Sequence, residues 1–263
     1  MTFRAVRILK EVDLVAAEDT RHSRKLFNHF GITTPLTSCF EHNEAQKGDY
    51  LVDLLRQGKQ IALISDAGTP AISDPGSLLV QRCVEAGIRV SAIPGPSACI
   101  SALSMSGLPT DRFCFDGFLH SRSAARCRAL EDYRHEQRTA VFYEAPHRLL
   151  ACLRDVVATL GEARQLAVVR ELTKLHEELF RGSVAEALEH FAQSRVRGEI
   201  VLLLAPAEKQ APAETVEEAL ERLLAETDQP LKTVIKQVAK EYGLSGSEVY
   251  AMALKLKKGS AGV

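Results

Sequence analysis

Two loops rich in glycine and proline carry the clearest chemical signal in the sequence. Residues 65–76 (SDAGTPAISDPG) and residues 93–98 (IPGPSA) each follow an apolar run and precede a helical pattern. Glycine lets the backbone approach a ligand closely, and proline fixes the shape of a loop at low entropic cost. Because loops at the carboxyl ends of parallel strands line the ligand crevice of an open α/β sheet, we expect both loops to form one site.

The two loops differ from the known phosphate-binding motifs. The sequence contains neither GxxxxGK followed by Ser or Thr nor GxGxxG, which argues against nucleoside triphosphates and dinucleotides as ligands. Its histidines and cysteines show no metal-ligand spacing, so we expect no metal site. A tight turn without function is the alternative interpretation, although long loops in compact domains usually carry function.

The elements that must position these loops alternate between helix and strand. In the first part of the chain, apolar periodicity, caps and glycine stops predict helices over residues 6–14, 20–30, 43–57 and 77–86, and strands over residues 15–17, 60–64 and 89–93. This alternation predicts an α/β domain with a parallel sheet over residues 1–108.

A second α/β domain is expected over residues 109–206, after a turn-rich break. Its strands are predicted at residues 113–119, 140–143, 166–170 and 200–204, with helices between them and a more mixed sheet. A polar Pro/Ala/Glu connector at residues 205–214 precedes a small helical unit over residues 215–263. The helix–glycine–helix pattern around Gly243 is typical of helix-turn-helix units, and a Ser245–Glu248 capping box is expected.

Composition indicates a globular protein that stays in the cytoplasm. The 263 residues are 46% apolar and 25% charged, and no apolar run reaches the roughly 20 residues that span a bilayer. The charged N-terminus lacks the apolar core of a signal peptide, and the scattered cysteines are expected to be reduced. The formal charge of -1 gives no overall basic field.

Basic residues do gather in two places, where they either bind phosphate or form a solvated helix face. One group is Arg122, Arg126, Arg128, Arg134 and Arg138, and the other is Lys232, Lys236, Lys240, Lys255, Lys257 and Lys258.

Five separated motifs resemble those of one protein family. They are the two loops above together with FYEAPHRL, RELTKLHEE and RGEIVLLL, which begin at residues 142, 170 and 197. In this order they resemble the bacterial small-subunit (16S) rRNA cytidine 2′-O-methyltransferases of the tetrapyrrole-methylase superfamily, over nearly the whole chain. The resemblance implies two α/β domains with S-adenosyl-L-methionine (S-adenosylmethionine) between them, methylation of a cytidine ribose and a homodimer.

Position by position, the resemblance also implies a set of cofactor-binding residues. Those expected from the first domain are Ala67, Gly68, Thr69, Ile72, Ser97 and Ala98, and those from the second domain are Glu144 and Leu172. The family begins with a further strand and loop that this sequence does not show, so the first sheet is expected to lack a central strand.

A ribose hydroxyl must lose its proton as it is methylated. Glu171 and Lys174 of the RELTK segment are the predicted catalytic residues, with Glu144 and His147 as alternatives. For each of them a salt bridge is an equally good interpretation.

Substrate contacts are expected from a polar cluster directly after the first strand. The resemblance places this cluster facing the RNA, and a guanidinium fork fits phosphate oxygens. The predicted substrate-binding residues are Arg21, His22, Arg24 and Arg148.

Two other functions stay open at this point. A corrin or porphyrin ring methylase would share the fold and the cofactor, although the C-terminal helical unit argues against it. An RNA-binding module without activity would bind RNA but gain no stability from S-adenosylmethionine.

Overall fold

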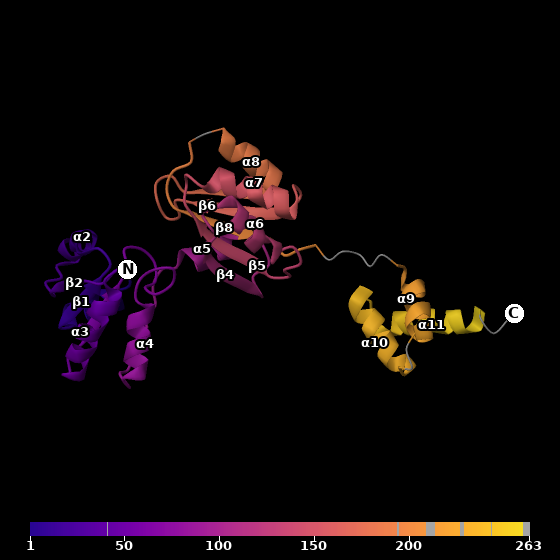
Figure 1. Cartoon of the computed structure of the whole chain (residues 1–263), viewed down its shortest axis with the longest axis horizontal. Coiled ribbons are helices and arrows are strands. Elements are labelled where there is room, and N and C mark those ends of the chain that lie inside the picture. Colours follow the sequence, from indigo (N-terminus) through magenta and orange to yellow (C-terminus); the bar gives the residue numbers. More distant parts are fainter. Residues whose placement is uncertain (41, 194, 209–213, 227–228, 243, 260–263) are drawn as a thin grey trace. The chain divides into compact units, whose positions relative to one another are not determined.

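The computed structural model describes residues 1–40, 42–193, 195–208, 214–226, 229–242 and 244–259. The chain forms two compact units, Met1–Ala207 and Glu208–Val263 (Figure 1). Residues 209–213 of the predicted connector lie outside the described residues. A boundary at residues 108–109 inside the first unit stays a prediction.

The first unit begins with a three-stranded parallel sheet in the order β2-β1-β3. Strand β1 (Leu14–Ala17) lies in the middle, between β2 (Leu36–Ser38) and β3 (Ile61–Ile64). Its alternating side chains point to opposite faces of the sheet. Val15 packs with α1 (Phe3–Glu11) and α2 (Thr20–Phe30), while Ala16 packs with α3 (Glu44–Arg56) and α4 (Ser77–Glu85).

The strand predicted at residues 89–93 is not formed, and that prediction was wrong. Residues 89–97 carry no strand structure, and Val90 is half-exposed. Within the described part of the chain, β3 has a strand neighbour only on its β1 side. Residues 89–93 do not pair with the open side of β3, so they stay outside the sheet.

A five-stranded mixed sheet forms the rest of the first unit, in the order β4-β5-β8-β6-β7. The pair β4–β5 is parallel and the other pairs are antiparallel, as the prediction of a mixed sheet requires. The strands are β4 (Phe113–Phe118), β5 (Thr139–Glu144), β6 (Gln165–Arg170), β7 (Glu178–Ser183) and β8 (Ile200–Leu204).

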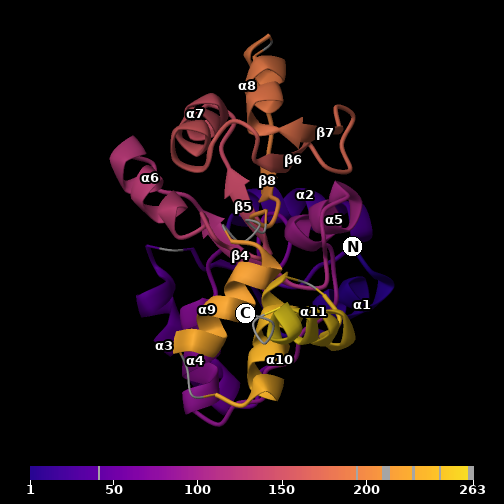
Figure 2. The ribbon, with the colours of Figure 1, turned by 90° about the vertical axis from the view of Figure 1, so that its right-hand side faces the viewer.

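Helices cover both faces of this second sheet (Figure 2). One face packs through Phe142, Val168 and Leu202 against three helices, and the other packs through Val141, Ala167 and Leu203 against α5 (Ala98–Ser106). The three helices are α6 (Ser123–Glu131), α7 (Leu149–Leu160) and α8 (Val184–Ala192).

Three connections of the second sheet meet at the same end of its inner strands. Ile200, the first residue of β8, pairs with Glu144 at the end of β5 and with Arg170 at the end of β6. The segments that follow β5 and β6 and the segment that precedes β8 therefore lie side by side. Two motifs from the sequence, YEAPHR and RELTK, come together at this end.

The second unit is a helical bundle of α9 (Val216–Glu226), α10 (Leu231–Tyr242) and α11 (Gly246–Gly259). Leu220, Val234, Val238 and Val249 form the centre of its core. The predicted capping box is confirmed, since Glu248 N donates to Ser245 Oγ and Ser245 N donates to Glu248 Oε2. Gly243 of the predicted helix-turn-helix lies outside the described residues. No helix in the described ranges has the length and apolarity to cross a membrane.

Candidate cofactor and substrate site

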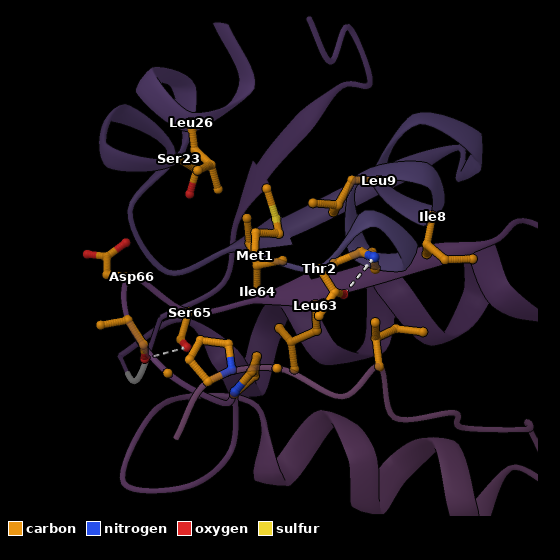
Figure 3. Close-up of a pocket in the computed structure, with 18 of the residues that line it drawn as sticks. Met1, Thr2, Ile8, Leu9, Ser23, Leu26, Leu63, Ile64, Ser65 and Asp66 are labelled. Atoms are coloured by element: carbon orange, nitrogen blue, oxygen red, sulfur yellow. Dashed lines mark hydrogen bonds between the residues drawn. The ribbon is translucent and has the colours of Figure 1, made fainter. Parts of the chain in front are cut away.

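The two glycine- and proline-rich loops line one hollow of about 340 Å³ (Figure 3). Ser65, Asp66, Ala67 and Gly68 contribute from the first loop, and residues 93–96 contribute from the second. Apolar side chains complete the walls, among them Ile8, Leu9, Leu26, Leu63 and Ile64. The structure thus brings together the two loops that the sequence singles out.

A hydrogen bond ties the two loops to each other. Thr69 Oγ1 donates to the carbonyl oxygen of Pro96 over 3.2 Å. Directly after this contact, the side chain of Ser97 caps α5 by accepting from Ile100 N, and Ala98 packs in the same apolar cluster as Leu172. Ile72 of the first loop is 48% exposed and does not line the hollow.

The far end of the first loop is held by a buried carboxylate from another helix. Glu44 Oε1 accepts hydrogen bonds from the backbone N–H groups of Gly76 (3.0 Å) and Leu79 (3.1 Å). These donors belong to the first turn of α4 and have no partner within the helix. Glu44 thereby fixes where the loop ends and the helix begins.

Backbone strain is concentrated in two of the family motifs. Among the described residues other than glycine, positive φ occurs at Ala71, Ser73, Glu171 and Thr173. The first pair lies in the loop at residues 65–76, and the second pair lies in the RELTK segment. Left-handed backbone at such residues costs about 1–3 kcal/mol each and clusters at functional sites.

The RELTK segment is locked to the segment before β8. Glu171 Oε1 accepts from Lys174 Nζ (2.8 Å) and from Glu199 N (3.1 Å), while Lys174 Nζ also lies 3.1 Å from Glu199 Oε2. Gly198 leaves the room for this packing, because a Cβ atom there would lie 2.2 Å from Cδ of Glu171. The two predicted catalytic residues are thus parts of one ion-pair network.

This pairing disfavours proton abstraction by either predicted residue. The hydrogen bond from Lys174 lowers the pKa of Glu171, which makes its carboxylate a weaker base. The hydrogen bond to Glu171 raises the pKa of Lys174, which keeps its ammonium group protonated at neutral pH. Lys174 is therefore poorly suited to accepting a proton, and its positive charge is balanced by the carboxylates of Glu171 and Glu199.

The pKa of Asp74 is shifted in the direction that makes a carboxylate a better proton acceptor. The sequence analysis did not predict a role for this residue. Burial raises the pKa of this carboxyl group, and the negative charges of Glu18, Asp66 and Glu199 raise it further, against a hydrogen bond from Ser65 that lowers it. The only sequence signal was an aspartate inside the unusual loop. A carboxylate with a raised pKa is a better proton acceptor near neutral pH.

Glu144 and Arg148 form a largely buried pair at the end of β5. Glu144 is 3% exposed, and its Oε1 lies 3.1 Å from Arg148 Nε. Arg148 also donates through Nη2 to the carbonyl oxygen of Leu119. Neither residue lines the hollow between the loops, and their predicted contacts with cofactor and RNA stay predictions.

One of the substrate-binding residues predicted on α2 lies at the hollow. His22 lines it, and Arg24 is exposed. Arg21 is tied to Asp19 by hydrogen bonds from Nε (3.2 Å) and Nη2 (3.0 Å), which leave its side chain 91% exposed.

The arginine-rich stretch around α6 is largely structural. Arg126 is 2% exposed and pairs with Asp155, while Arg134 and Arg138 pair with Glu131 and Glu136. These pairs satisfy three of the five arginines without a ligand, while Arg122 and Arg128 are exposed.

Comparison with known proteins decides the family. A model of the tetrapyrrole (corrin/porphyrin) methylases matches residues 1–188. The chain belongs to this family. The methylase is 45% identical over 97% of its length to "Ribosomal RNA small subunit methyltransferase I" of Pasteurella multocida (strain Pm70), of which it covers 92%. It is also 45% identical over 97% of its length to the protein of that name from Escherichia coli O157:H7, of which it covers 90%.

Solved structures share the fold of this methylase. Uroporphyrin-III-C-methyltransferase from Thermus thermophilus aligns with a TM-score of 0.55 at 19% identity, over 78% of this chain and 87% of that one. A diphthine synthase aligns with a TM-score of 0.60 at 13% identity, over 78% of this chain and 84% of that one. The predicted α/β fold of the tetrapyrrole-methylase type, with an added helical unit, is confirmed.

Proposed function

We propose that this methylase transfers the methyl group of S-adenosylmethionine to the 2′-oxygen of a cytidine ribose in small-subunit ribosomal RNA. One observation carries the RNA substrate: relatives 45% identical over 97% of the chain are named as small-subunit ribosomal RNA methyltransferases. The sequence identity to the uroporphyrin methylase is only 19%. The five motifs of the cytidine 2′-O-methyltransferases support the choice of nucleotide and oxygen.

The hollow between the two loops suits S-adenosylmethionine. Its apolar walls can receive the adenine ring, and the backbone of Ala67 and Gly68 can hydrogen-bond to the polar parts of the molecule. When bound, the cofactor supplies an electrophilic methyl group on a positively charged sulfur. The carboxylate of Asp66, which lines the hollow, favours this cation over the neutral product, and the backbone N–H of Asp66 donates to Glu18 Oε2 over 3.1 Å.

Asp74 is the proton acceptor in this proposal. It lies in the same loop as Ala67 and Gly68 but does not itself line the hollow; its carboxylate interacts with Ser65, which does, and burial raises its pKa. The ion pairs of Lys174 with Glu171 and Glu199 hold the RELTK segment in its strained conformation, in which Glu171 and Thr173 have positive φ. Placement of the ribose hydroxyl in line with the methyl group supplies the remaining rate enhancement.

A methyl-transfer assay with two competing acceptors tests the proposal. S-adenosylmethionine labelled in its methyl group is offered together with unmethylated small ribosomal subunits or with uroporphyrinogen. We expect label in the RNA and none in the ring. Label in the ring alone would establish the ring methylase, and RNA binding without any transfer would establish the inactive RNA-binding module. The homodimer implied by the family resemblance belongs to the same proposal, and sedimentation equilibrium tests it.

A further inference from the structure

A second hollow of about 500 Å³ lies at one end of the inner strands β5 and β8 of the five-stranded sheet. The segment between β5 and α7 lines it with Pro146, His147 and Leu150, and the segment before β8 lines it with residues 195–198. Since β5 and β8 are antiparallel neighbours, these two segments come from the same end of the sheet.

The charged side chains that line this hollow are both arginines, and a histidine lies beside them. His147, Arg195 and Arg197 are exposed, and no aspartate or glutamate lines the hollow. Within the described ranges, no hydrogen bond or ion pair engages their side chains. Arg148, the next residue after His147, is instead neutralised by Glu144. A chain with a formal charge of -1 therefore keeps a local basic site at this place.

The N-terminus of α7 faces the same hollow. This helix of 12 residues begins at Leu149, no side chain caps it, and no acidic residue lies in its first turn. Leu150 of that first turn lines the hollow. The free N–H groups and the helix dipole favour an anion here, independently of the arginines.

The hollow adjoins the strained RELTK segment. The carbonyl oxygen of Arg197 accepts from Arg170 Nη1 over 3.2 Å, which anchors the backbone between the two arginines and β8. The next residue, Gly198, packs against the side chain of Glu171. A group bound in the hollow would thus lie beside Glu171 and Lys174.

We propose that this hollow binds a backbone phosphate of the RNA substrate. Two arginines, a histidine and an uncapped helix N-terminus match the charge and the several acceptor oxygens of a phosphate diester. A bound phosphate fixes the strand beside the RELTK segment but reads no base. The proposal rests on the function proposed above, since it assumes that the macromolecule carrying the phosphate is RNA.

The test compares two double variants with wild type. Arg195→Ala/Arg197→Ala removes both arginines of the hollow, and Arg112→Ala/Arg154→Ala removes two exposed arginines elsewhere in the same unit. Fluorescence anisotropy measures the Kd for a labelled fragment of small-subunit ribosomal RNA between about 50 and 200 mM salt, where phosphate contacts set the salt dependence. Circular dichroism confirms that each variant folds, and calorimetry measures its affinity for S-adenosylmethionine.

We expect the hollow variant to bind RNA about tenfold more weakly at low salt, with a log–log salt slope smaller by about 1. Its affinity for S-adenosylmethionine should match that of wild type. An unchanged slope, or an equal loss in the control variant, would overturn the phosphate site while wild-type methylation of RNA still stood. Wild type could also bind RNA without ever methylating it. If the hollow variant then still showed the smaller salt slope, the result would support the phosphate site and refute the proposed function.

Discussion

Glu44 and Gly76 are joined by a hydrogen bond of 3.0 Å between a buried carboxylate on one helix and the residue that begins another. The same oxygen accepts from Leu79 N, so a single side chain satisfies two N–H groups at the start of α4. This contact sets the end of the loop that lines the proposed cofactor site. The loop is therefore shaped from outside the segment that the sequence motif covers.

Glu44→Ala should lower the free energy of unfolding by about 1–3 kcal/mol, because two buried donors lose their acceptor. It should also weaken binding of S-adenosylmethionine. Glu44→Gln keeps an acceptor oxygen and should recover most of both. Urea denaturation and calorimetry measure the two effects, with Glu85→Ala on the exposed side of α4 as the control. Equal stability of the Glu44→Ala and Glu85→Ala variants would show that the contact is unimportant.

Thr69→Val removes the hydroxyl that joins the two loops and keeps the shape of the side chain. Loss of one hydrogen bond of about 1 kcal/mol should weaken the affinity for S-adenosylmethionine about fivefold. Thr139→Val is the matched control, since Thr139 Oγ1 also donates to a proline carbonyl, that of Pro109, away from the hollow. It should reduce stability and leave cofactor affinity unchanged. The opposite pattern would place the cofactor elsewhere.

Asp74→Asn should abolish most of the activity and yet stabilise the fold at neutral pH. The folded pKa of Asp74 lies above its ordinary value of 3.8 because burial disfavours the charged form. The folded protein thus binds more protons than the unfolded chain between these two values, and stability falls as the pH rises through that window. The neutral amide avoids this loss.

Melting temperatures of wild type and Asp74→Asn between pH 4 and pH 8 check the stability effect, and the advantage of the variant should grow with pH. Methyl transfer by wild type should increase as the pH rises through the raised pKa, and the variant should be slower by about a hundredfold or more. Full activity in the variant would remove Asp74 as the proton acceptor.

Gly198→Ala should disrupt the network that holds the RELTK segment. The new methyl group would meet Glu171 at 2.2 Å, and φ at this position is +87°. Gly161→Ala is a close control, because its φ is +92° and nothing lies within 4 Å of the added atom. Backbone strain of about 1 kcal/mol should be common to both, and overpacking should cost Gly198→Ala about 1–3 kcal/mol more. Equal melting temperatures of the two variants would contradict the described packing.

Elements with local signals could be predicted from the sequence. Helix α2 has both predicted ends, because Asp19 accepts from Arg21 N at its start and Gly31 adopts the left-handed conformation at its end. Strand β2 has only three residues, too few for a periodic pattern, and it was not foreseen. The apolar run at residues 89–93 looked like a strand but has no strand beside it. Whether a strand forms depends on its partner, which a single run of residues does not reveal.

The candidate site, too, could be predicted only in part. Glycine and proline spacing located both loops of the hollow, because loop chemistry is local. The states of the ionisable groups depend on contacts between distant segments. Lys174 faces Glu199 across 25 positions, and the pKa of Asp74 is raised partly by Glu199, which lies in the segment before β8. The sequence could therefore name Lys174 as a candidate base but could not show that its partners keep it protonated.

The central claim concerns the atom that receives the methyl group. The most direct measurement is mass spectrometry of nucleosides from small-subunit RNA, after reaction of the purified protein with S-adenosylmethionine labelled in its methyl group. The predicted result is labelled 2′-O-methylcytidine, with its formation slower by about a hundredfold or more when the Asp74→Asn variant replaces wild type. Label on a base, on another nucleoside, or in no RNA product would contradict it.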